Sequence, residues 1–170
     1  MSAEAAPGRG PRAPRDYASL RPRAAAIAAL PTRQERMAAF IALLWPALAP
    51  TGVSWMGFYV DDPCGPEHAR LTLGPREPKP ACSPIGLHGA CGACLLSAQV
   101  LVVKDVRELG EGYIACDPRD MSEVVIPCTE ASGACWGVLD LDSHDFSSFD
   151  HTDAAELAYL VQAAGLAVSP

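Results

Sequence analysis

Long hydrophobic runs are missing from this sequence. The longest apolar stretches lie near AAAIAAL and FIALLW, and neither approaches the ~20 residues of a membrane-spanning helix. Charged residues are also few, at 19%, and aromatic residues reach only 6%, whereas 49% of the 170 residues are hydrophobic. These values argue against a transmembrane helix and against a disordered chain, and they predict one globular domain with a sizeable core.

Basic residues are scarce beyond the N-terminal segment. Residues 37–170 contain six basic and seventeen acidic residues, whereas residues 1–36 contain seven arginines and three acidic residues, and the whole chain carries −7. Because nucleic acids bind to basic patches, we expect no nucleic-acid partner. A small cationic substrate, or one with a free amine, fits the acidic part of the chain better.

A secretory signal is missing as well, because the apolar stretch that follows RPR is short and begins late. The cysteine count is seven, whereas a secreted disulfide framework usually has an even number. We therefore expect a cytoplasmic protein, without membrane contact, whose thiols are reduced. In that compartment cysteine clusters indicate redox or metal chemistry rather than structural bridges.

The first 16 residues are mostly Pro, Gly, Ala and Arg, with almost nothing to bury. We predict a disordered tail over residues 1–16 and a single domain over residues 17–170. An organellar transit peptide is the alternative for the tail, although its prolines and glycines oppose the amphipathic helix that such a peptide forms.

Helices are expected at both ends of the domain. An Ala-rich segment predicts a helix over about 16–30. Thr32 and Glu35 form a capping box, and apolar side chains then recur at helical spacing until Pro46, which should end or kink the second helix. Asp150 is the expected N-cap of the last helix.

Strand-like segments lie between these helices. They are VSWMGFYV, RLTLG, VLVVKDV, EVVIPCT and ACWGVLDLDS, and a short helix is expected at GACGACLLSAQ. Because the strands follow one another in hairpins, their order predicts an α+β domain with an antiparallel sheet and helices packed on one face. In the first strand Trp55 and Tyr59 share one face, while Met56 and Phe58 share the other.

The cysteines fall into two groups. Cys64 lies in a polar turn, and Cys128 and Cys135 lie in strand-like sequence, where a cysteine is usually a small buried hydrophobe. Of the remaining four, three lie in loops or at a helix start, where a helix N-terminus lowers the pKa of a thiol toward the reactive range. These four are Cys82, Cys91, Cys94 and Cys116.

The sequence CGAC invites two interpretations. A thioredoxin-like dithiol would need a surrounding βαβ unit, which the strand order does not provide. A zinc site would need a second pair of ligands, and Cys82 with His88 makes an irregular set.

Three carboxylates are expected to converge. Asp140 and Asp142 are two residues apart in a strand and therefore point to the same face, and Glu123 opens the strand expected beside it. Like charges placed together on a strand are costly unless a cation meets them, so the group suits the ammonium of a small ligand. The alternative is ordinary turn chemistry at a strand end. Trp55 is either a core aromatic or an apolar wall of the same pocket.

Several of these segments resemble one protein family. SWMGFY, LTLGP, KPAC, YIACD, SEVVIP and GVLDLDS, together with the CG at Cys91, are similar to the motifs of the free methionine-(R)-sulfoxide reductases over residues 17–166. The resemblance implies a single GAF domain with an antiparallel sheet of about six strands flanked by helices. It also implies a homodimer that reduces free L-methionine-(R)-sulfoxide and needs no cofactor or metal.

The resemblance also assigns roles to the thiols. It makes Cys116 the catalytic thiol, Cys82 its resolving partner and Cys91 an auxiliary cysteine. Attack on the substrate would leave Cys116 as a sulfenic acid, which condenses with a nearby thiol to a disulfide, and thioredoxin would reduce that disulfide. Cys94 stands where the family has a small residue, and an extra resolving thiol is one interpretation of it.

The remaining roles concern substrate binding. The resemblance makes Trp55 the wall for the substrate methyl group, and it makes three carboxylates the holders of the substrate amine and the agents of proton transfer. These are Glu123, Asp140 and Asp142. The sequence departs from the family at Tyr113, where the family has histidine, and in a longer loop at residues 61–70.

Two alternative functions remain open from the sequence. One is a non-catalytic GAF sensor of a small ligand or of oxidation, and the other is a zinc-bound structural domain. The pair Cys82 and Cys116 favours the enzyme, because a sensor has no need of a resolving partner.

Overall fold

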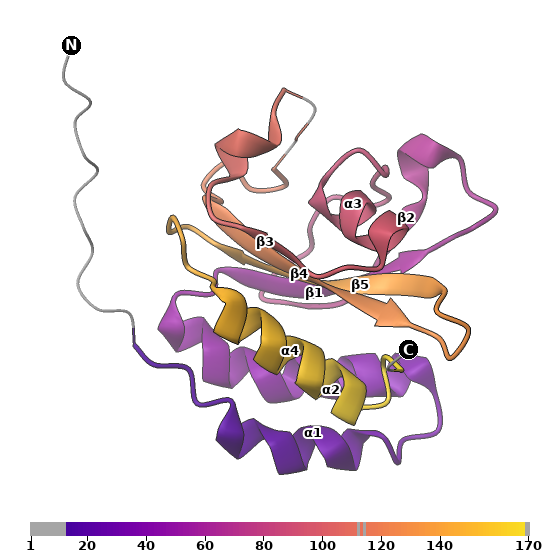
Figure 1. The fold of residues 1–170 in the computed structure, drawn as a ribbon, viewed down its shortest axis with the longest axis vertical. Helices are drawn as coiled ribbons and strands as arrows, with labels where there is room; N and C mark the ends of the chain where they lie inside the picture. Colours follow the sequence, from indigo (N-terminus) through magenta and orange to yellow (C-terminus); the bar gives the residue numbers. More distant parts are fainter. Residues whose placement is uncertain (1–12, 112, 114, 169–170) are drawn as a thin grey trace.

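The computed structural model describes residues 13–168 apart from residues 112 and 114. Its centre is a five-stranded antiparallel sheet in the order β2-β1-β5-β4-β3 (Figure 1). The strands are β1 (Trp55–Asp61), β2 (Leu71–Glu77), β3 (Leu101–Val103), β4 (Ser122–Thr129) and β5 (Cys135–Ser143). The predicted α+β class and antiparallel sheet are confirmed, with five strands against the expected number of about six.

Helices cover both faces of this sheet. They are α1 (Arg21–Ile27), α2 (Arg33–Leu48), α3 (Ala90–Ser97) and α4 (His151–Ala163). In Figure 1, α1, α2 and α4 lie below the sheet and α3 lies above it. The expectation that all helices pack on one face is therefore wrong for α3, whose apolar residues pack against the upper side chains of β4 and β5.

The helix ends follow from local chemistry. The Thr32–Glu35 capping box opens α2, and Asp150 caps α4 by accepting hydrogen bonds from the backbone of Thr152 and Asp153. The expected break at Pro46 comes late, because α2 continues to Leu48. Since Pro46 lies in the last turn, it removes only one backbone hydrogen bond, and the chain leaves α2 through a 3-10 turn.

The period of two in the strands separates two clusters of side chains. In β1, Met56 and Phe58 join the large core under the sheet, whereas Trp55 and Tyr59 face the upper side, as the sequence predicts. The side chains of strand β5 also alternate between the two faces of the sheet, but one of its two sets is acidic. Its leucines, such as Leu139, enter the lower core, and the aspartates between them face the upper side.

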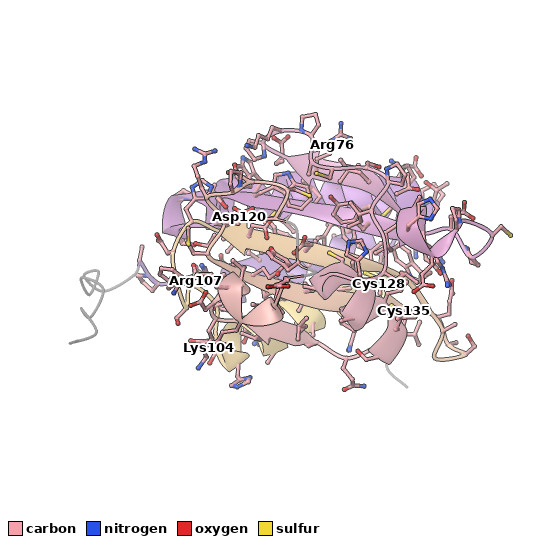
Figure 2. All side chains as sticks on the ribbon, turned by 90° about the horizontal axis from the view of Figure 1, so that it is seen from above. Arg76, Lys104, Arg107, Asp120, Cys128 and Cys135 are labelled. Carbon is pink, nitrogen blue, oxygen red and sulfur yellow. The ribbon has the colours of Figure 1, made fainter. Side chains whose placement is uncertain are left out.

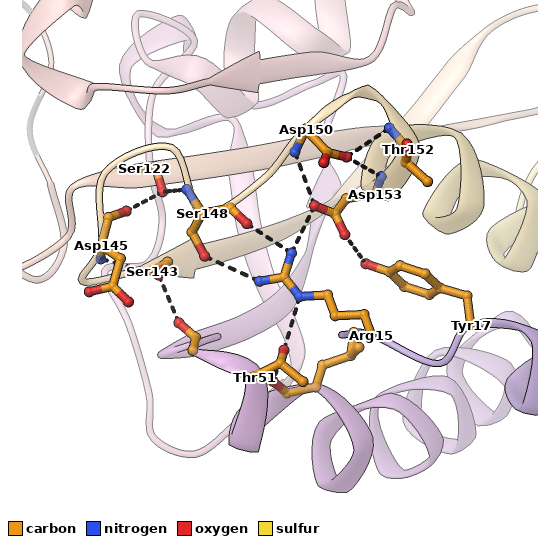
Figure 3. A network of polar contacts seen from close by, with 12 residues as sticks. Arg15, Tyr17, Thr51, Ser122, Ser143, Asp145, Ser148, Asp150, Thr152 and Asp153 are labelled. Carbon is orange, nitrogen blue, oxygen red and sulfur yellow. Dashed lines mark hydrogen bonds and ion pairs between the residues drawn. The ribbon is translucent and has the colours of Figure 1, made fainter. Parts of the chain in front are cut away.

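The segment that precedes α1 is held in the domain by Arg15 (Figure 3). Its guanidinium contacts Asp153 at 2.9 Å, donates hydrogen bonds to Ser148 and Thr51, and is only 2% exposed. The Tyr17 hydroxyl donates to the same aspartate at 2.8 Å. Arg15 therefore belongs to the domain and not to the tail expected over residues 1–16. Residues 1–12 of that expected tail lie outside the described residues.

We expect Arg15→Ala to lower the free energy of unfolding by about 3 kcal/mol, because it removes the buried positive charge that lies 2.9 Å from the buried carboxylate of Asp153. Urea unfolding monitored by circular dichroism measures the change. Arg21→Ala is the matched control, because Arg21 forms its ion pair with Glu156 on the same helix α4 but is nearly half exposed. Equal losses for the two variants would contradict a structural role for Arg15.

Candidate active site

A cavity opens on the upper side of the sheet, between the strands, α3 and the loops that carry Cys82 and Cys116. It is lined by Trp55, Tyr59, Ala81, Ile85, Gly86, Gly89, Ala90, Cys91, Tyr113, Cys116, Asp120, Glu123, Asp140 and Asp142 and has a volume of about 60 Å³. An adjoining cavity of about 240 Å³ shares five of these residues. All the site residues that the sequence predicts line the first cavity, except Cys82, which lies beside it.

The three carboxylates come together through strand register. Glu123 on β4 pairs with Asp142 on β5, and Asp142 pairs in turn with Trp55 on β1. Glu123, Asp140 and Asp142 are 3%, 6% and 8% exposed, and one oxygen from each lies within 4.8 Å of the others. Within the part of the chain that the structure describes, Glu123 Oε1 and Asp140 Oδ1 have no hydrogen-bond partner. Two buried acceptors therefore point to a cationic ligand or a metal ion.

Burial and mutual repulsion keep protons on this cluster. Burial, followed by the charge of Asp140, raises the pKa of Glu123 to about 9. Burial raises the pKa of Asp140 to about 7, and burial with the two neighbouring carboxylates raises the pKa of Asp142 well above its ordinary value. At neutral pH the cavity thus contains carboxylic acids that can donate a proton, beside Asp140, whose lower pKa leaves it partly ionised and able to accept one.

We expect Asp140→Asn to stabilise the fold by about 1–3 kcal/mol at pH 8 and to have little effect near pH 4. The pKa of Asp140 in the folded state lies above its unfolded value, so its contribution to stability is complete below pH 4 and is lost as the pH rises through 7. Thermal unfolding at both pH values tests this. The exposed Glu111→Gln serves as control, and an Asp140→Asn protein that is less stable than the parent at pH 8 would contradict the assignment.

The thiol of Cys116 lies close enough to the thiol of Cys82 to shift its pKa, so the structure brings the predicted catalytic pair together. Both cysteines are exposed. Partial burial of the thiol, followed by the Cys82 thiol, raises the pKa of Cys116 to about 12. Cys116 therefore needs a neighbouring base to become a thiolate, and the carboxylates that line the same cavity are candidates for that base.

Two aromatic residues of β1 hold the loop that carries Cys82. The Trp55 indole N–H donates to the backbone carbonyl of Lys79 at 2.8 Å, and the Tyr59 hydroxyl donates to that of Cys82 at 2.8 Å. Trp55 lines the cavity, as predicted, and also anchors this loop. Its indole lies across Gly57, where an added Cβ would lie 2.4 Å from the ring, so only glycine fits there.

Cys91 is buried under the cavity instead of exposed at a helix start. Its thiol donates to Asp140 Oδ2 at 3.3 Å, and it is 6% exposed. The expectation of a lowered pKa at this helix N-terminus is wrong. Burial and the carboxylates, Asp140 first, raise the pKa of Cys91 and outweigh the helix dipole.

Sequence reasoning missed Asp120, which lines both cavities and is 5% exposed. Its Oδ1 lies 3.6 Å from His144 Nε2 and 3.4 Å from Ser54 Oγ. The role of Tyr113 was missed too, since it lines the cavity beside Glu123 and offsets part of the effect of burial on the pKa of that carboxyl group. Both residues lie in the irregular segment between β3 and β4, where no periodicity shows which side chains turn inward.

The residues that the structure describes do not support a zinc site at CGAC. Among the described residues, the only His, Cys, Asp or Glu side chains close enough to share one ion are the three carboxylates. Cys82, His88 and the CGAC cysteines are not brought together as one ligand set. Of the other cysteines, Cys128 is buried, as predicted for a strand cysteine, and Cys135 is partly buried.

The fold and the site together define a GAF-type domain whose cavity brings cysteine thiols close to buried carboxyl groups. A solved GAF domain superposes with a TM-score of 0.77 at 27% identity, covering 91% of this chain and 90% of that one. The reduced form of fRMsr from Staphylococcus aureus superposes with a TM-score of 0.81 at 30% identity, covering 92% and 97%. No family model matches the chain.

A sequence relative sharpens this class. The free methionine-R-sulfoxide reductase of Saccharomyces cerevisiae is 37% identical over 123 residues, which make up 71% of this chain and 67% of the relative. This chain belongs to the free methionine-R-sulfoxide reductase family and is an oxidoreductase of that family. No helix among the described residues is long and apolar enough to cross a membrane.

Proposed function

We propose that this enzyme reduces free L-methionine-(R)-sulfoxide to methionine, with Cys116 as nucleophile and Cys82 as resolving thiol. The observation that carries the proposal is the convergence of a thiol pair and three buried carboxylates on one cavity. The name of the yeast relative gives the substrate of that protein, and this cavity has the groups that such a substrate requires.

The cavity suits both ends of the substrate. Glu123 and Asp140 each offer a buried oxygen without a hydrogen-bond partner among the described residues to the N–H donors of the ammonium, and Asp142 adds a third carboxyl group beside them. The Trp55 indole and the Tyr59 ring, whose centroids lie 6.1 Å apart, offer an apolar wall to the methyl group. Binding through the amine selects the free amino acid against a methionine sulfoxide inside a peptide, whose nitrogen is uncharged.

The chemistry needs one proton donated and one removed. The Cys116 sulfur attacks the sulfoxide sulfur while its thiol proton passes to an ionised carboxylate, and a protonated carboxyl group donates to the sulfoxide oxygen. The raised pKa values of Glu123 and Asp142 keep such a donor available at neutral pH. The hydroxyl group then moves from the substrate sulfur to the Cys116 sulfur as the bond between the two sulfurs breaks. Methionine leaves with the electron pair, and Cys116 becomes a sulfenic acid.

Resolution follows from the proximity of the two thiols. Cys82 attacks the sulfenic sulfur of Cys116, a disulfide forms, and the oxygen leaves as water. A dithiol protein of the thioredoxin type then reduces the disulfide by exchange. Cys82 is exposed, so its sulfur is accessible to that reductant.

We expect this protein, supplied with thioredoxin, thioredoxin reductase and NADPH, to form methionine from the free (R)-sulfoxide and not from the (S)-sulfoxide. Chromatography of the amino acids measures both products. The fixed positions of Cys116 and the carboxylates make the site chiral. The configuration of the (S) epimer at sulfur does not match it. Equal reduction of the two epimers, or of neither, would contradict the proposal.

A further inference from the structure

One buried cysteine has no part in the mechanism above. Cys94 is 1% exposed, lies one helical turn after Cys91 on α3, and donates its S–H to the carbonyl oxygen of Val125 at 3.6 Å. Cys91 donates to Asp140. Val125 and Asp140 are directly paired across β4 and β5, so the two thiols contact one cross-strand pair.

We propose that Cys91 and Cys94 form a second, buried redox pair that receives the oxidising equivalents of the first turnover and allows another before any reductant acts. The proposal rests on the reductase function above and adds Cys94 to its thiols. It would give each chain two disulfide-forming pairs, one in the exposed loops and one in α3.

Helix geometry allows this pairing. Side chains three residues apart on a helix have Cβ atoms about 5–6 Å apart, and a disulfide needs about 3.5–4.5 Å. A modest local movement is enough, and Cys91 lies in the first turn of α3, whose N–H groups have no intrahelical partners. Both thiols hydrogen-bond to the Val125–Asp140 pair, so both sulfurs lie against the same part of the sheet.

The cavity connects this pair to the catalytic thiol. Cys91 and Cys116 both line it, and both sulfurs lie close enough to Tyr59 to raise the pKa of its hydroxyl, after the larger effect of burial. Cys82 reaches Cys116 from the loop on the other side. Cys116 is therefore accessible to one thiol from each pair.

The transfer consists of two thiol–disulfide exchanges. Cys91, as thiolate, attacks the Cys116 sulfur of the Cys116–Cys82 disulfide, and Cys82 leaves as a thiolate. Cys94 then attacks the Cys91 sulfur, and Cys116 leaves. The two protons of the α3 thiols pass to Cys82 and Cys116, so one disulfide replaces another and no further oxidant is consumed. Burial raises the pKa of both α3 thiols, which makes this transfer slower than the first turnover.

The test counts methionine released per chain with excess free methionine-(R)-sulfoxide, without oxygen and without any reductant. Each sulfoxide oxidises two thiols, so we expect about two methionines per chain, one fast and one slow, and a Cys91–Cys94 disulfide in peptide maps. Cys94→Ala should release about half as much. Cys128→Ala is the matched control, because this buried cysteine does not line the cavity and should leave the count unchanged.

Several outcomes would overturn the inference. These are one methionine per chain with reduced α3 thiols in the parent, a count of two in Cys94→Ala, or a map in which Cys94 pairs with Cys135. The map of the parent protein decides the matter even if Cys94→Ala folds poorly. Release of no methionine at all would instead contradict the proposed function on which the inference rests.

Discussion

The Cys116→Ser protein is expected to lose about 10³-fold or more of its methionine-forming activity, measured with the free (R)-sulfoxide and a thioredoxin system. A hydroxyl is far less acidic than a thiol, and the carboxylates near Cys116 are too weak as bases to ionise it. The serine also cannot form a disulfide, so no later step proceeds. Measurable multiple turnover by this variant would refute the mechanism.

Other cysteine variants separate this chemical role from loss of structure. Cys82→Ser should release methionine in a first turnover and then slow sharply, because the exposed partner of Cys116 is gone. Cys64→Ser and Cys135→Ser should retain most activity, since neither residue lines the cavity. In Figure 2 Cys128 and Cys135 lie together, away from Asp120, and Cys128→Ser is expected to retain most activity as well.

N-acetyl-methionine-(R)-sulfoxide is expected to have a kcat/KM about 10³-fold or more below that of the free amino acid. Acetylation removes the positive charge and adds bulk, and it leaves the oxygens of Glu123 and Asp140 buried without partners. A site built around a polar group discriminates strongly against ligands that lack it. Steady-state kinetics with both compounds measures the ratio.

The carboxylate variants provide the control. Glu123→Gln and Asp142→Asn should weaken the binding of the free amino acid, measured as Kd, and change the binding of the acetylated compound much less, so that the ratio of the two Kd values shrinks. Loss of a proton donor should lower kcat for both compounds. If the acetylated compound is reduced as well as the free one by the parent, the three carboxylates are not an ammonium site. Their spacing would then reflect only turn chemistry at a strand end.

Much of this site follows from rules that act over a few residues. The period of two in a strand puts Asp140 and Asp142 on one face, and hairpin order places Glu123 on the neighbouring strand. The T-x-x-E pattern of Thr32 and the N-cap Asp150 locate the starts of two helices. Such features depend on local geometry, and the sequence shows them directly.

Other parts depend on contacts between distant segments, which no spacing reveals. Arg15 looks like part of a polar tail until Asp153, far along the chain, is placed beside it. The position of Cys91 at a helix start predicts a low pKa for its thiol. Burial and the contact with Asp140, which lies on strand β5, raise that pKa instead. Asp120 belongs to a loop without periodicity, so its inward position follows only from the completed fold.

Strand β5 supplies the hydrophobic core and the active site by alternate residues. Leu139 and Leu141 enter the lower core, and Asp140 and Asp142 face the cavity. Inserting or deleting one residue within β5 would exchange these faces, placing two carboxylates in the core and two leucines in the cavity. We therefore expect a change in length to be accepted in the connecting loops, such as the β1–β2 connection around residues 62–70, whereas the strand itself accepts substitutions but not a shift in register.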